Sequence, residues 1–175
     1  MIISVHATFG AAIASLIPTH PVEGFVLGFA SHFALDLIPH KDYDLISIER
    51  DSEGKAKPID LVIAKFKFVR DVLLVSFDAL VGICLAFMFF FEPVHPWIFL
   101  IGAIGAILPD FIVFTYLLLE HKTLGHFYDF HSRFDTIINK KLKKKLSQAI
   151  GVVLQFCTLV VLIVIMYGLK VLFIS

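Results

Sequence analysis

A histidine and an aspartate lie four residues apart in a stretch of sequence that is otherwise strongly apolar. The stretch is 24–38, and the two residues are His32 and Asp36. One turn of helix separates them, so their side chains would project from the same helix face. Ionisable groups are costly inside a membrane, and those that occur there are usually paired, bound to a metal or otherwise in use. The pair is therefore the first candidate for chemistry.

Three further ionisable residues of interest lie within other apolar stretches: His6, Asp78 and Asp110. If two antiparallel helices turn at 18–20, residues whose numbers add to about 38 lie at the same depth, because both helices rise equally per residue. His6 is then level with His32. The same reasoning for a turn at 92–96 places Asp78 level with Asp110. We expect these groups to gather in one layer of the bundle.

The composition is that of an integral membrane protein. Of its 175 residues, 58% are hydrophobic and 17% are charged, and the mean hydropathy is +0.88. Globular domains average about 45–50% apolar and about 25% charged residues. Acidic and basic residues are equal in number, 15 of each, and no basic surface of the kind that binds nucleic acid is apparent. We expect membrane lipids as partners, together with an unidentified small-molecule or lipid substrate, and no nucleic acid.

Five apolar segments predict an all-α fold, a polytopic membrane bundle of about five helices in a single domain over 1–175. The segments are 5–17, 21–38, 70–91, 97–119 and 148–169. A membrane span needs about 20 apolar residues, so the first segment is short. The prolines at 18 and 21 predict a tight turn between the first and second segments, which would then form a helical hairpin at the N-terminus. Gly10 and Gly28 come level in this hairpin, and small residues let membrane helices approach closely.

The two long polar connections, 39–69 and 120–147, lie on one face if all five segments cross the membrane. That face then carries every Lys and Arg except Lys170. The positive-inside rule predicts that it is cytoplasmic. The lysine cluster in 140–145 is interpreted as an anchor that sets the topology and also touches anionic lipid head groups.

Imidazoles and carboxylates that converge in a dry pocket predict a divalent metal site. Such donors suit zinc, and also manganese or iron where oxygen ligands dominate. The predicted ligands are the following: His6, His32, Asp36 and Asp110. Asp78 is a further ligand or a catalytic general base, and the polar connections supply secondary candidates: His40, His126 and His131. A bound metal lowers the pKa of water to roughly 7 and polarises a phosphoryl or carbonyl oxygen, which predicts hydrolysis.

Each of these residues also has a plainer interpretation. His32 and Asp36 can form a hydrogen-bonded pair within one helix, and Asp78 can make a polar contact between helices. Asp110 follows a proline and can cap a restarted helix. The alternation of aromatic and polar residues in 125–131 is typical of a segment at the membrane surface.

Three short motifs resemble those of the bacterial inner-membrane metal-dependent hydrolases. They are His6-Ala7-Thr8-Phe9-Gly10, the Gly28–Asp36 segment with Pro39-His40 after it, and Leu108-Pro109-Asp110. The His-x-x-x-Asp element is also similar to that of zinc-dependent phospholipase C. The resemblance implies a helical metal-site fold in the inner membrane and hydrolysis of a phosphoester or lipid-type substrate. It also implies His6, His32, Asp36 and Asp110 as ligands.

The chain departs from the family pattern in two ways. The Leu-Pro-Asp motif follows the helix with His32, whereas in the family it precedes that helix. Phe111-Ile112 stands where the family has a further acidic residue, so a second metal has no assigned ligands.

Two other classes of function remain open. One is a non-enzymatic membrane protein that binds or conducts an ion or proton, and the other is a structural bundle whose polar groups only hold helices together. Loss of His32 would abolish turnover in a hydrolase, abolish flux in a carrier, and mainly destabilise a structural bundle.

Overall fold

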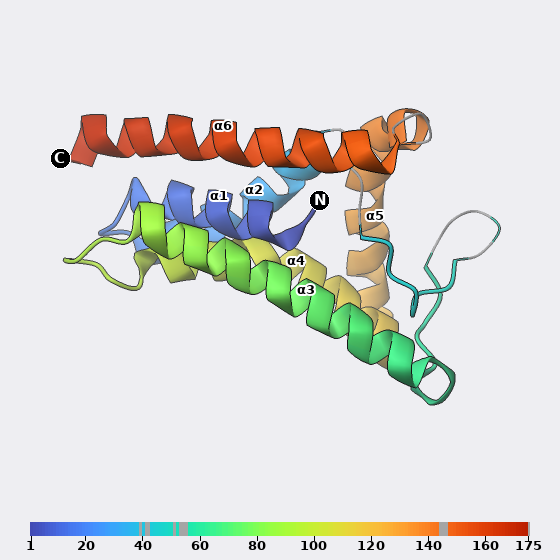
Figure 1. Cartoon of the computed structure of the whole chain (residues 1–175). Coiled ribbons are helices and arrows are strands. Elements are labelled where there is room, and N and C mark those ends of the chain that lie inside the picture. Colours follow the sequence, from blue (N-terminus) through green and yellow to red (C-terminus); the bar gives the residue numbers. More distant parts are fainter. Residues whose placement is uncertain (39, 41–42, 51, 53–55, 144–146, 175) are drawn as a thin grey trace.

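The computed structural model is all-α, with six helices and no strand among the residues that it describes (Figure 1). These are all residues except 39, 41–42, 51, 53–55, 144–146 and 175. The helices are α1 (Ile3–Ser15), α2 (Pro21–Asp36), α3 (Leu61–Phe90), α4 (Ile98–Leu119), α5 (Lys122–Lys143) and α6 (Gln148–Ile174). The predicted fold class, a membrane helical bundle with a short N-terminal hairpin, is confirmed.

Three of the helices are long and apolar enough to cross a membrane, which indicates an integral membrane protein. The apolar stretches are 64–90 in α3, 98–119 in α4 and 149–172 in α6. Within the most apolar part of each helix, 39% of residues are buried in α4 but only 11% in α3 and 22% in α6. The central helix is therefore α4, and most side chains of α3 and α6 face the surroundings of the protein.

The short helices α1 and α2 form the predicted hairpin, and α4 packs against both (Figure 1). A Cβ atom on Gly10 of α1, or on Gly28 of α2, would collide with the backbone carbonyl of Gly102 in α4. The sequence suggested that Gly10 and Gly28 bring α1 and α2 together. Instead they let both helices approach α4 backbone to backbone, because the small residues of α1 and α2 face a third glycine.

The polar connection 120–147, expected as a loop, contains the amphipathic helix α5. Glu120 ends α4 in the left-handed conformation, with φ of 52°, and the chain then turns into α5. Figure 1 shows α5 running across one end of the bundle, roughly perpendicular to α6. The bundle therefore has one more helix than predicted. The sequence does not mark it as a membrane helix, because its charged residues rule out a span.

Candidate metal centre

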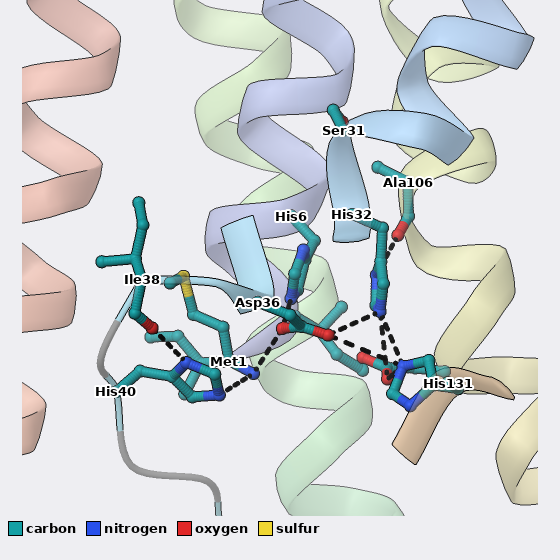
Figure 2. Close-up of polar contacts among 12 residues, drawn as sticks. Met1, His6, Ser31, His32, Asp36, Ile38, His40, Ala106 and His131 are labelled. Atoms are coloured by element: carbon teal, nitrogen blue, oxygen red, sulfur yellow. Dashed lines mark hydrogen bonds and ion pairs between the residues drawn. The ribbon is translucent and has the colours of Figure 1, made fainter. Parts of the chain in front are cut away.

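Five ionisable side chains from four helices meet near the end of the bundle that α5 crosses (Figure 2). They are His6 of α1, His32 and Asp36 of α2, Asp110 of α4 and His131 of α5. The side chains of His6 and His32 have no exposed surface, and Asp36 is 4% exposed. Asp110 is 29% exposed, so the site is accessible from the side of Asp110.

The rings of His6 and His32 stack on each other, with centroids 4.1 Å apart. This confirms that the two residues lie at the same depth in the α1–α2 hairpin. The carboxylate of Asp36 lies across the ends of both rings: Oδ1 is 3.3 Å from His6 Nε2, and Oδ2 is 3.2 Å from His32 Nε2. One carboxylate thus faces two imidazoles.

His32 is held in the orientation expected of a metal ligand. Its Nδ1 lies 2.8 Å from the Ala106 carbonyl oxygen, which can only accept, so Nδ1 donates the hydrogen. Ala106 belongs to the turn of α4 in which Pro109 interrupts the helical hydrogen-bond ladder, because proline has no N–H to donate. In the neutral ring Nε2 then carries the lone pair and faces His131 and Asp36. Ligating histidines commonly donate their other ring N–H to a carbonyl in this way.

His131, a secondary candidate from the sequence, lies among the primary candidates. Its Nε2 is 2.9 Å from His32 Nε2, 3.4 Å from Asp110 Oδ1 and 3.6 Å from Asp36 Oδ2. His32 Nε2 is in turn 3.6 Å from Asp110 Oδ1. The structure thus joins His131 to the four predicted ligands.

The donors are of the types that bind a divalent metal ion, and three at a time they lie close enough together to share one. A tetrahedral ion with bonds of about 2.0–2.1 Å holds neighbouring ligand atoms roughly 3.3–3.4 Å apart, and the nitrogen–oxygen distances in the site are 3.2–3.6 Å. The candidate ligand atoms form two groups, and within each group all atoms lie within 4.8 Å of one another. The first group is His6, His32 and Asp110. The second is His32, Asp36 and His131. His32 belongs to both groups.

His6 provides a second, independent indication of a ligand. Both nitrogens of its buried ring have no hydrogen-bond partner in the described part of the chain. Nε2 is near Asp36 but is not aligned for a hydrogen bond. A buried polar group without a partner is unfavourable by about 1–3 kcal/mol, and native proteins rarely keep one without a reason. A bound ion would supply a partner for one of the two nitrogens.

The position of His6 depends on how α1 begins. The first N–H groups of a helix have no acceptor within the helix, and here side chains from distant segments supply the acceptors. Gln155 Oε1 accepts from Ile2 N–H at 2.9 Å, the Tyr43 hydroxyl from Ile3 N–H at 2.9 Å, and Asp78 Oδ2 from Ser4 N–H at 2.8 Å. A negative charge at this helix end also interacts favourably with the helix dipole.

Tyr43 also donates its hydroxyl hydrogen to Asp78 Oδ2. Burial and then the nearby Asp78 carboxylate raise the pKa of Tyr43, so the hydroxyl keeps its hydrogen. Asp78 is thus placed as an anchor for α1, and the general-base role suggested by the sequence stays a prediction. Sequence reasoning overlooked Tyr43 and Gln155. An isolated glutamine in an apolar helix was the available signal for Gln155, whereas nothing in the sequence marked Tyr43.

The remaining secondary candidates lie outside both ligand groups. His40 borders the site: its Nδ1 donates to the Ile38 carbonyl at 2.7 Å, and its Nε2 is 2.7 Å from the Met1 amino nitrogen (Figure 2). That amino nitrogen is itself 3.2 Å from Asp36 Oδ1. His126 is exposed and its Nδ1 lies 3.0 Å from the Lys122 carbonyl of its own helix, so it is not brought to the site.

No protein family model, curated protein or solved structure matches this chain. The resemblance to the inner-membrane hydrolases therefore stays a prediction based on three short motifs.

Proposed function

We propose that the chain is a membrane-bound, metal-dependent hydrolase that acts on a phosphoester or lipid-type substrate. The observation that carries this proposal is the buried His6 ring, which stacks on His32, lies 3.3 Å from Asp36 Oδ1 and makes no hydrogen bond within the described part of the chain. Buried polar groups are nearly all hydrogen-bonded in native proteins, whereas His6 Nδ1 has no hydrogen-bond partner in the described residues and Nε2 has only the ion-pair contact with Asp36. Imidazole and carboxylate donors favour zinc, with manganese or iron as alternatives.

In this proposal the ligands come from the five clustered residues: His6, His32, Asp36, Asp110 and His131. A divalent ion there would lower the pKa of water and polarise a phosphoryl or carbonyl oxygen. The chain's own residues orient and shield the site. The Ala106 carbonyl fixes the ring of His32, while Asp110, the most exposed of the five, marks the side from which substrate approaches.

The location of the site supports a substrate presented by the membrane. The five residues lie near the end of the bundle crossed by α5, beside helices that are long enough to span a bilayer. The distribution of Lys and Arg favours a cytoplasmic location for that end, and we place the protein in the bacterial inner membrane on the basis of the motif resemblance. A phospholipid or a phosphoester near the membrane surface could reach Asp110 without leaving the interface.

The test is hydrolysis by the purified protein in detergent or nanodiscs. Phosphoesters and phospholipids would be offered after reconstitution with zinc or manganese, with and without a chelator. We expect turnover that the chelator removes and that is absent from His32→Ala, whose folding is verified by circular dichroism. The exposed His126→Ala should keep turnover.

A carrier would give a different result. Metal-loaded protein that hydrolyses none of these substrates, but passes protons or metal ions into liposomes in a manner that depends on His32, would overturn the hydrolase proposal.

A further inference from the structure

The position of α5 is that of a helix lying along a membrane surface. α6 contains a stretch that can cross the bilayer, and α5 runs across the end of the bundle roughly perpendicular to it (Figure 1). Helices that lie in the interface have one apolar and one polar face and are commonly rich in Lys and Arg. α5 likewise has one apolar and one polar face, and its apolar face packs on the bundle.

One face of α5 packs on the bundle through aromatic rings. Phe33 of α2 lies 5.3 Å from Phe130 and 5.1 Å from Phe134, measured between ring centroids. Tyr128 stacks on Tyr116 of α4 at 5.1 Å. The same face carries His131 into the metal centre, so the packing of α5 sets the position of one ligand.

The opposite face of α5 is polar and exposed. It presents Lys122, His126, Asp129 and Arg133, at spacings of three and four residues that keep them on one side of the helix. Lys140, Lys141 and Lys143 extend the basic character to the end of α5, and segment 120–147 has seven Lys and Arg against three Asp and Glu. This charge suits anionic head groups, each lysine near such a surface strengthening attachment about fivefold.

We infer that α5 binds anionic phospholipid head groups through the lysines at its C-terminal end, and that this binding holds His131 in the metal centre. The other four ligands are on α1, α2 and α4, which pack backbone to backbone. His131 alone among the five is carried by a helix at the surface. The metal affinity would then depend on the lipid, a consequence that rests on the proposed function.

Hydrogen exchange of α5 tests the lipid contact without any metal. The metal-free protein would be compared in nanodiscs of neutral phosphatidylcholine and in nanodiscs that also contain phosphatidylglycerol. We expect slower exchange in 123–134 with the anionic lipid, by up to a factor on the order of a hundred for three lysines. Combined substitution Lys140→Gln, Lys141→Gln and Lys143→Gln should remove the difference.

The matched control is Lys65→Gln with Lys67→Gln, two exposed lysines of α3, which should keep the difference. Inorganic phosphate added to neutral nanodiscs should not reproduce it, because a single free ion does not offer a charged surface. Equal exchange in the two lipids, or a lipid effect that survives loss of the three α5 lysines, would overturn the inference.

Zinc affinity in the same nanodiscs tests the link to His131. Wild type should bind zinc more tightly in nanodiscs with the anionic lipid than in neutral ones. His131→Ala should bind zinc more weakly than wild type, with the same affinity in both kinds of nanodisc. A lipid effect of equal size in His131→Ala would show that α5 does not act through this ligand. Wild type that binds no zinc in either lipid would contradict the proposed function, while the exchange measurement would still decide the role of the lysines.

Discussion

The two sides of the metal centre are built in different ways. On one side α1, α2 and α4 meet through glycines, and Gly102 lies so close to Gly10 and Gly28 that no side chain fits between them. On the other side α5 reaches the bundle through the rings of aromatic residues. The first contact brings backbone against backbone, whereas the second depends on side-chain rings alone. We call the first the fixed side; it carries four of the candidate ligands. We call the second the adjustable side; it carries the fifth, His131.

The largest effect should come from breaking the glycine contact. Gly102→Leu would place a side chain against the Gly10 carbonyl and Ala14. Overpacking typically costs about 1–3 kcal/mol, and we expect a loss at or above the top of that range because backbone must move. Unfolding in detergent, followed by circular dichroism, measures it.

Gly168→Leu is the matched control, since a Cβ there meets nothing within 4 Å. It should unfold like wild type. Equal stability of Gly102→Leu and Gly168→Leu would show that the fixed side does not depend on close helix contact.

The next effect concerns the beginning of α1, which belongs to the fixed side. Asp78→Ala removes the acceptor of Ser4 N–H and of the Tyr43 hydroxyl. Each buried donor left without a partner costs about 1–3 kcal/mol, so stability and metal affinity should both fall. Asp78→Asn keeps an acceptor oxygen and should retain most of both.

The asparagine variant also separates an anchor from a general base. Asp78→Asn that folds and binds metal as wild type does, yet has lost turnover, would restore the catalytic role suggested by the sequence.

The smallest effect is expected on the adjustable side. The Tyr128 hydroxyl accepts a hydrogen bond from Ala56 N–H at 3.0 Å, so Tyr128→Phe loses a bond worth about 0.5–1.5 kcal/mol. Hydrogen exchange should become faster in α5 and remain unchanged in α1 and α2. Equally faster exchange in α1 and α2 would indicate that the two sides are not independent.

The fold was largely predictable because hydrophobicity dominates it. Apolar segments located the helices of the membrane bundle, and the prolines at 18–21 marked the first turn. Equal rise per residue then placed His6 level with His32, as the stacked rings confirm. The relative depth of two residues in a hairpin depends only on the position of the turn and the rise per residue, both of which can be read from the sequence.

Rotation and packing partners were not predictable in the same way. Depth does not say which way a helix faces. It therefore did not predict that Gly10 and Gly28 face Gly102 of α4, or that Asp78 accepts a hydrogen bond from Ser4 N–H at the start of α1. The sequence of α5 mixes charged and apolar residues. It is therefore too polar for a membrane span and was expected to be a loop. As a result His131 was ranked below the ligands on apolar helices, although it lies 3.4 Å from Asp110.

Metal content is the most direct test of the site. Protein purified without chelator and equilibrated with zinc would be measured by elemental mass spectrometry as wild type, His6→Ala, Asp36→Asn and the exposed control His126→Ala, all verified as folded. We predict near-stoichiometric zinc in wild type and His126→Ala, and its loss from His6→Ala and Asp36→Asn. Wild type that stays empty with both zinc and manganese, or His6→Ala that holds as much metal as His126→Ala, would contradict the metal centre.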